Sequence, residues 1–202
     1  MINQTLKNMI PNILTILRMI AIPFFVILLL QEHALAALLI FVIACITDYF
    51  DGNLARKWKY ISKFGQIMDP LADKFLVLSA LILLCIEPIA YLHWSVMVII
   101  TLREVIISVY RSYHSKKGRI IPAIFWGKLK TTLQMIGIIG ALTLYAAFDM
   151  FDNFLSPTFV ENTILGIQIY FWMVVLITIY SGIHLMRMTI TQHDKGDRKW
   201  KL

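Results

Sequence analysis

Uncharged apolar stretches alternate with shorter polar segments along the whole chain. Six such stretches can be traced, and they cover approximately residues 13–30, 34–47, 71–86, 89–102, 131–148 and 163–185. A helix needs about 20 apolar residues to cross the ~30 Å hydrocarbon core of a bilayer, and lipid offers no hydrogen bonds to an exposed backbone. Because no period-two alternation typical of a barrel is sustained, the pattern predicts an all-α integral membrane protein with six transmembrane helices.

The ends of several stretches carry charged residues. The second stretch, residues 34–47, is shorter than a membrane span, so its helix is expected to continue into the charged residues that follow. Residues 1–10 are predicted to form a short N-terminal interfacial helix that ends at Pro11, whose ring disfavours helix in the residue before it. A cleavable signal peptide is the alternative for this end of the chain, and it would leave five spans. The polar tail over residues 192–202 is predicted to be disordered or bound to the membrane surface.

The composition supports the membrane class. The chain has 202 residues, of which 59% are hydrophobic and 15% are charged, and its mean hydropathy is +0.73. These values exclude a soluble globular enzyme, and the six spans leave room for one membrane-embedded domain over residues 1–202. Both cysteines, Cys45 and Cys85, lie in apolar stretches, which gives no pattern of a disulfide framework or of a metal–thiolate site.

The formal net charge of +7 is distributed unevenly between the turns. Lysine and arginine occur near the start of the chain, around the second and fourth turns and in the tail. The alternate turns carry acidic residues instead, namely Glu32, Glu87, Asp149, Asp152 and Glu161. The positive-inside rule therefore predicts that both termini and the even-numbered turns face the cytoplasm, in a cell membrane that the chain crosses several times.

Four aspartates gather around the second turn, and they are Asp48 and Asp51 before it and Asp69 and Asp73 after it. At 100° per residue the first pair falls within one arc of about 100° of its helix, together with Gly52 and Ala55. The second pair is spaced four residues apart on one face of the next helix, with Gly65 one turn earlier. Two pairs of acids can therefore face each other across a helical hairpin.

Carboxylates at this depth require neutralisation. An aspartate at the centre of a membrane helix costs roughly 2.5 to 3.5 kcal/mol, so four without partners would cost about 10 to 14 kcal/mol. Divalent Mg²⁺ or Mn²⁺ prefers oxygen ligands, two such ions match the charge of four aspartates, and a pair of ions is a common device for displacement at phosphorus. Structural alternatives are an N-cap role for Asp69, which precedes a proline, and surface ion pairs of the first two aspartates with Arg56 or Lys57.

These residues fill the pattern D-x-x-D-G-x-x-A-R-x₈-G-x-x-x-D-x-x-x-D without exception. The pattern resembles the signature of the CDP-alcohol phosphotransferase family. The resemblance implies a six-helix membrane fold, usually a homodimer, with a polar cavity that faces the cytoplasm and holds two divalent cations, Mg²⁺ or Mn²⁺. It also implies transfer of a phosphatidyl or similar group from a CDP-linked donor to an alcohol, with release of CMP.

The resemblance further implies a role for each residue of the pattern. Asp48, Asp51 and Asp69 would ligate one ion, and Asp48, Asp69 and Asp73 would approach the second. Asp73 would also be the catalytic base, which fits the chemistry because an alcohol becomes a good nucleophile only when a nearby carboxylate takes its proton. The residues expected to bind CDP are Asn12, Thr15, Arg18, Gly52, Ala55, Arg56 and Gly65. Tight helix packing is the alternative role of the two small residues Gly52 and Ala55.

Three further stretches are similar to the bacterial members of the family that make phosphatidylglycerophosphate. Residues 11–18 read P-N-x-L-T-x-x-R, residues 103–111 read R-E-x-x-x-S-x-x-R, and residues 127–134 read G-K-x-K-T-x-x-Q. The first stretch would border the nucleotide, and snorkelling to the membrane surface is the alternative for its arginine, Arg18. The other two would form a pocket for an anionic acceptor, whose phosphate is expected to bind Arg103, Arg111, Lys128 and Lys130.

The expected substrates are CDP-diacylglycerol as donor and sn-glycerol 3-phosphate as acceptor, with membrane lipid around the spans and no nucleic acid. The chain departs from the usual family pattern at Asn53 and over residues 120–125, so other acceptors stay open: phosphatidylglycerol, as in a cardiolipin synthase, or inositol phosphate. A divalent-cation transporter is the alternative from another class, since membrane acids also line ion paths. Lys116 and Lys117 are expected to contact lipid headgroups rather than substrate.

Overall fold

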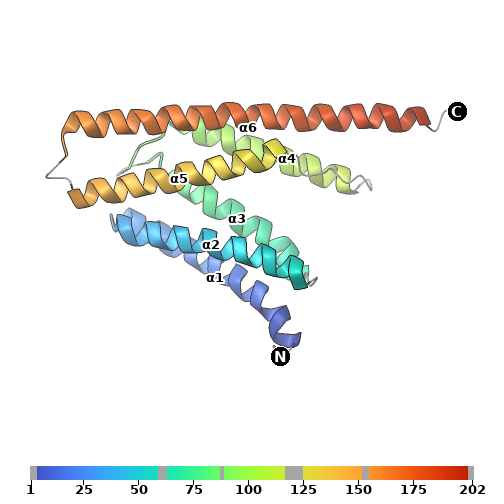
Figure 1. The fold of residues 1–202 in the computed structure, drawn as a ribbon, viewed down its shortest axis with the longest axis horizontal. Helices are drawn as coiled ribbons and strands as arrows, with labels where there is room; N and C mark the ends of the chain where they lie inside the picture. The colour runs from blue at the N-terminus through green and yellow to red at the C-terminus, as the bar shows by residue number, and fades with distance from the viewer. Residues whose placement is uncertain (1–3, 59–62, 87–88, 117–124, 152–154, 200–202) are drawn as a thin grey trace. The chain divides into compact units, whose positions relative to one another are not determined.

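The computed structural model of the chain describes residues 4–58, 63–86, 89–116, 125–151 and 155–199. Within these ranges, the side chains of residues 4–12, 49–58, 63–67, 69–70, 116 and 190–199 lie outside the description. The described residues form helices joined by short connections, and no strand occurs among them (Figure 1). The helices are α1 (Gln4–Leu30), α2 (Ala34–Trp58), α3 (Lys63–Leu83), α4 (Trp94–Lys116), α5 (Phe125–Phe151) and α6 (Pro157–Lys199). The predicted all-α fold is confirmed, and the described residues form six helices.

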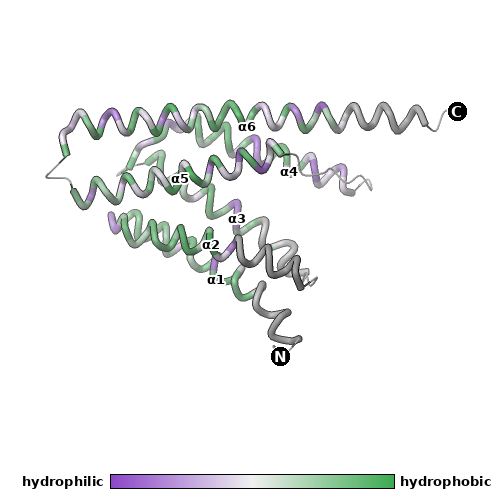
Figure 2. Tube along the Cα trace, in the orientation of Figure 1, coloured by the Kyte–Doolittle hydropathy of each residue, from purple (hydrophilic) through white to green (hydrophobic). Residues whose placement is uncertain are grey.

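The apolar character of the helices confirms the membrane class. In the described part of the chain, three helical segments are long and apolar enough to cross a bilayer, and they are Ile13–Leu30, Phe125–Phe151 and Pro157–Thr189. A shorter apolar segment, Ala34–Asp48, lies in α2, and hydrophobic residues predominate in the coloured parts of α1 and α2 (Figure 2). As predicted, α2 does not stop where its apolar stretch ends, because the helix continues through Asp48 to Trp58.

Two predictions about the ends of the chain are wrong. The separate interfacial helix that was expected to end at Pro11 is instead the first part of α1, which runs without interruption from Gln4 to Leu30. A proline inside a helix removes one backbone hydrogen bond and favours a kink, and the many bonds of a 27-residue helix outweigh that loss. The polar tail is helical through Lys199 as part of α6, so the alternative of a disordered tail is wrong, since adding a residue to an existing helix costs much less than starting a new one. Binding of the tail to the membrane surface stays a prediction.

The chain divides into two compact units. The first unit comprises Met1–Tyr91 and Ile138–Glu161, and the second comprises Leu92–Gly137 and Asn162–Leu202. The first unit therefore contains α1, α2 and α3, whereas the second contains α4, the first half of α5 and most of α6.

In the first unit α1 packs along α2 and also contacts α3. The buried residues of α2 recur every three or four positions, as expected for one helix face against a neighbour, and they are Ala34, Ala37, Phe41 and Ala44. The ring of Phe41 lies 5.3 Å from that of Phe25 on α1, centroid to centroid. Because the alanines of this face allow the two backbones to approach closely, polar residues further along the same helices also come within reach of one another.

In the second unit a glycine sets the contact between α5 and α6. A Cβ atom added at Gly137 would lie 2.6 Å from Cε1 of Tyr170, which is closer than such atoms can approach. The hydroxyl of Tyr170 donates a hydrogen bond of 2.7 Å to the carbonyl oxygen of Leu133, one turn earlier on α5. The aromatic ring thus packs closely against the glycine, and its hydroxyl ties the two helices together.

Candidate active site

The first unit contains a buried arginine on α1. Arg18 lies on the same helix stripe as the buried residues Thr15, Phe25 and Leu29, so its position in the helical repeat turns it inward. Its relative exposure is 1%. A charge removed from water in this way requires a partner of opposite charge, and the alternative that Arg18 snorkels to the membrane surface does not describe its position.

The partners of Arg18 are two aspartates of the family pattern. The Nη1 atom of Arg18 lies 3.0 Å from Oδ1 of Asp48 on α2 and 3.0 Å from Oδ1 of Asp73 on α3. Since both oxygens contact the same nitrogen, the two carboxylates converge on one point from different helices. Their side chains remain 44% and 46% exposed, respectively, so both are accessible although the arginine between them is not.

The other residues of the aspartate pattern lie where the backbone alone is described. Asp51, Gly52, Ala55 and Arg56 follow Asp48 within the uninterrupted helix α2, and Gly65 and Asp69 precede Asp73 within α3. Their side chains, and that of Asn12 on α1, are outside the described residues. Because α3 starts at Lys63, Asp69 lies inside the helix, and the alternative that Asp69 is an N-cap before a proline is wrong.

The described donor atoms suit a hard divalent cation. Two carboxylate oxygens approach one point and are accessible, and carboxylate oxygen is the ligand that Mg²⁺ and Mn²⁺ prefer. Among the residues whose side chains are described, no three histidine, cysteine, aspartate or glutamate side chains come together, and the remaining two aspartates of the pattern lie outside that set. Asp48 and Asp73 therefore fit one side of a metal site.

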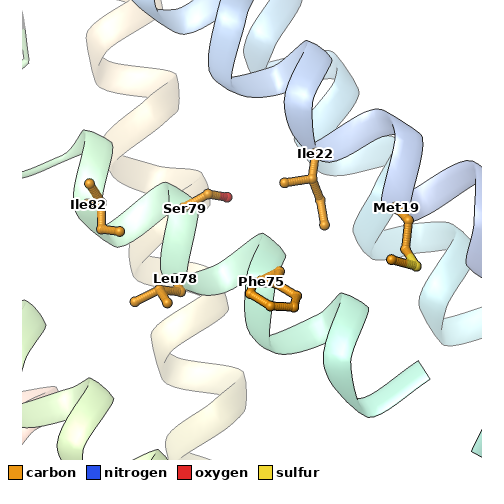
Figure 3. A pocket seen from close by; sticks show the side chains of 6 residues that line it. All are labelled: Met19, Ile22, Phe75, Leu78, Ser79 and Ile82. Atoms are coloured by element: carbon orange, nitrogen blue, oxygen red, sulfur yellow. The ribbon is translucent and has the colours of Figure 1, made fainter. Parts of the chain in front are cut away.

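An apolar pocket of about 250 Å³ lies between α1 and α3 in the first unit (Figure 3). It is lined by Met19, Ile22, Phe75, Leu78, Ser79 and Ile82. The hydroxyl of Ser79 donates 2.9 Å to the carbonyl oxygen of Leu76 in its own helix, so this residue adds little polarity to the pocket. Met19 directly follows Arg18 in α1, whereas Phe75 comes two residues after Asp73 and therefore lies about 200° further around α3. The pocket is lined by apolar faces of the two helices.

The second unit contains a separate polar cluster made by α4, α5 and α6. Glu104 of α4 forms an ion pair with Nζ of Lys130 on α5, and its Oε1 atom lies 3.5 Å from Nη1 of Arg103. The side chain of Lys130 is 4% exposed. On the other side of Arg103, Nη2 donates a hydrogen bond of 2.6 Å to Oγ of Ser181 on α6. Among the described side chains, two cations and one carboxylate are therefore held together, and these three groups carry a net charge of +1.

The predicted acceptor residues divide into two groups. Arg103 and Lys130 come together through Glu104. Glu104 is part of the R-E-x-x-x-S-x-x-R stretch, but no role was predicted for it. Arg111 and Lys128 are exposed residues of α4 and α5. Lys116 and Lys117 fall outside the described side chains.

Sequence reasoning missed the contribution of α6. Ser181 and Thr178 are buried polar residues three positions apart in an otherwise apolar span, next to Gly182. Hydroxyl groups and a glycine on one face of a membrane helix are a recognisable sign of close helix contact. This signal could have directed attention to α6, although it would not have named Arg103 as the partner.

Comparison with known proteins places the chain in a family. The family model of CDP-alcohol phosphatidyltransferases matches residues 8–160, which include every residue of the aspartate pattern. The chain therefore belongs to the CDP-alcohol phosphatidyltransferase family, and the resemblance seen in the sequence is confirmed. Members of this family use divalent cations.

Several curated relatives carry one name, "CDP-diacylglycerol--glycerol-3-phosphate 3-phosphatidyltransferase". The protein of Haemophilus influenzae is 42% identical over 145 residues, which cover 69% of this chain and 78% of the relative. That of Mycoplasma pneumoniae is 36% identical over 198 residues, covering 88% and 82% of the two chains. The Escherichia coli protein is 41% identical over 136 residues, covering 64% and 74%.

Proposed function

We propose that this protein transfers the phosphatidyl group of CDP-diacylglycerol to the 1-hydroxyl of sn-glycerol 3-phosphate and produces phosphatidylglycerophosphate and CMP. The observation that carries this proposal is the convergence of Asp48 and Asp73 on one point between α1, α2 and α3. Asp48 belongs to the first half of the family pattern, on α2, and Asp73 belongs to the second half, on α3. The names of the relatives in three bacteria support the same donor and acceptor.

In the proposed reaction Asp73 accepts the proton of the attacking hydroxyl group. The hydroxyl oxygen forms a bond to the phosphorus next to diacylglycerol, and the bond from this phosphorus to the oxygen of CMP breaks. Asp73 suits this role because its carboxylate is accessible while the arginine beside it fixes one of its oxygens. Two divalent cations, Mg²⁺ or Mn²⁺, would be held by Asp48, Asp51, Asp69 and Asp73 and would supply positive charge opposite the diphosphate.

The nucleotide is proposed to bind beside this cluster. The proposed contacts are Asn12, Thr15, Arg18, Gly52, Ala55, Arg56 and Gly65. Of these, Thr15 and Arg18 are described with their side chains, and both are buried in α1. Arg18 contacts the two converging carboxylates. An arginine in this position can bind phosphate through its planar, two-pronged guanidinium group.

The acceptor is proposed to bind Arg103, Lys130, Arg111 and Lys128 through its phosphate. The cluster around Glu104 carries an excess positive charge, which favours an anionic acceptor and repels choline or ethanolamine. Phosphatidylglycerol and inositol phosphate carry negative charge too, and they are the competing acceptors. We further propose one domain, a homodimer in the cytoplasmic membrane, and an active site and termini that face the cytoplasm.

A turnover assay tests the proposed function. The purified full-length protein is incubated with CDP-diacylglycerol, sn-glycerol 3-phosphate and Mg²⁺ or Mn²⁺, and CMP and the lipid product are measured. We expect CMP and phosphatidylglycerophosphate in equal amounts, and no product when EDTA removes the metal. CMP release with phosphatidylglycerol or inositol phosphate, but not with sn-glycerol 3-phosphate, would contradict the assignment of the acceptor. Metal flux into liposomes without nucleotide would instead support a transporter.

The apolar pocket between α1 and α3 is proposed to hold part of an acyl chain of the donor. Ser79→Leu should fill this space, and the KM for long-chain CDP-diacylglycerol should rise about fivefold, since overpacking costs on the order of 1 kcal/mol or more. The donor with two eight-carbon chains should be less affected. Ser79→Ala, which leaves the pocket open, is the matched control. Equal KM values for the leucine and alanine variants with the long-chain donor would exclude this use of the pocket.

A further inference from the structure

Arg103 is held mainly by residues of α6. Its side chain is 12% exposed, and Nη2 donates 2.6 Å to Oγ of Ser181. A methyl group added at the next residue, Gly182, would lie 3.4 Å from Nε and 3.6 Å from Cγ of the same arginine. Ser181 therefore holds the end of the guanidinium group, and the absence of a side chain at Gly182 leaves room for the aliphatic part of Arg103.

The hydroxyl of Ser181 has a fixed direction. It donates a hydrogen bond of 3.0 Å to the carbonyl oxygen of Thr178 in the same helix, and the residue is 2% exposed. A hydroxyl has one hydrogen to donate and two lone pairs to accept, so a serine that donates to the helix presents its lone pairs elsewhere. Here one of them accepts the hydrogen bond from Arg103. The serine thus orients the arginine rather than merely filling space.

The arginine retains donors for a further ligand. Its Nε atom is buried and has no hydrogen-bond partner among the described residues. Glu104 is shared between Arg103 and Lys130, which leaves the cluster with excess positive charge. A buried N–H group without an acceptor is unfavourable, and an anionic oxygen is the partner that satisfies both the hydrogen bond and the charge.

We propose that Ser181 is a positioning residue of the acceptor site, which holds the guanidinium group of Arg103 in the orientation that binds the phosphate of the acceptor. This inference rests on the proposed function. It adds α6 to the acceptor site, although Ser181 lies beyond residues 8–160, which the family model matches. The role concerns the anionic acceptor, so the binding of CDP-diacylglycerol should not depend on Ser181.

The test compares kinetic constants of the full-length enzyme. Ser181→Ala should raise the KM for sn-glycerol 3-phosphate about tenfold, since a hydrogen bond to a charged group is lost. The kcat and the KM for CDP-diacylglycerol should stay within about twofold of the unchanged enzyme. Ser181→Thr, which keeps the hydroxyl, should restore the KM. Thr189→Ala removes an α6 hydroxyl that donates to the carbonyl oxygen of Leu185, and it is the matched control.

A double-mutant cycle shows whether Ser181 acts through Arg103. When Arg103 is replaced by alanine, the further change Ser181→Ala should have no additional effect on the KM for the acceptor. If Ser181→Ala folds poorly, Ser181→Cys takes its place in the test, because cysteine nearly keeps the volume of serine but is a weak acceptor. The cysteine variant should show the same rise in the KM for the acceptor. If the KM for the acceptor is the same in both variants as in the wild-type enzyme, the inference is overturned. The proposed function is still supported in that case, provided that the wild-type enzyme is active with sn-glycerol 3-phosphate. Absence of that activity would overturn the proposed function itself.

Discussion

Replacing Asp73 by asparagine is expected to lower the rate of CMP release by a factor of about 10² to 10⁴, the range that general acid–base catalysis typically contributes. Asparagine keeps the size of the side chain, and its carbonyl oxygen can still accept the hydrogen bond that Arg18 donates to Oδ1 of Asp73. It cannot take the proton of an attacking hydroxyl group. The measurement is the initial rate of CMP release at saturating donor and acceptor, with thermal unfolding recorded in the same detergent.

Asp149→Asn is the control for this variant. Asp149 is an exposed carboxylate on α5, and its replacement should leave turnover within about twofold, as is usual for surface substitutions. If Asp73→Asn turned over at the rate of the control, another group would have to act as the base. The assignment of Asp73 would then be wrong even if the reaction itself were correct.

Replacing Arg18 by methionine is expected to lower kcat/KM by a factor of about 10² or more. Methionine fills much of the buried volume, but it leaves Asp48 and Asp73 facing each other without the cation that contacts both. The expected loss corresponds to about 2.7 kcal/mol of transition-state stabilisation. Arg18→Lys should retain more activity because it keeps the charge, although a lysine cannot present the same planar donor group.

Thermal unfolding separates the catalytic and structural contributions of Arg18. Arg187→Met is the matched control, since Arg187 is exposed on α6 and has no assigned role in the reaction. A variant Arg18→Met that unfolds at a lower temperature but turns over at the rate of this control would show that Arg18 only stabilises the helix packing. A loss of turnover without a shift in unfolding would favour direct contact with the nucleotide.

The sequence predicted what depends on local periodicity. The spacing of Asp48 and Asp51, and that of Asp69 and Asp73, required continuous helices through the charged residues, and α2 and α3 are continuous there. Pro11 was misjudged because the preference of the residue before a proline is local, whereas the length of α1 is determined by the whole helix. Helical periodicity is a property of neighbouring residues, and it could be read without knowledge of the fold.

The partners of the charged residues could not be predicted in the same way. Arg18 and Asp73 are 55 positions apart, and Arg103 and Ser181 are 78 positions apart. No spacing rule joins residues so distant in the chain, because their contact depends on which helix faces meet. For this reason the exposed Arg111 and Lys128 looked equivalent to the buried Lys130 in sequence, and the serine of α6 was not noticed.

The position of the cluster around Arg18 along its helices determines where the lipid donor must react. At a rise of about 1.5 Å per residue, Arg18 lies about 18 Å from Leu30, Asp48 about 21 Å from Ala34, and Asp73 about 15 Å from Leu83. A hydrocarbon layer is ~30 Å thick, so each of these charges lies within one layer thickness of the apolar end of its helix. Extraction of an acyl chain into water would cost about 0.8 kcal/mol for each methylene group. A donor that meets these groups at this depth keeps both chains in the bilayer and avoids that expense throughout the catalytic cycle.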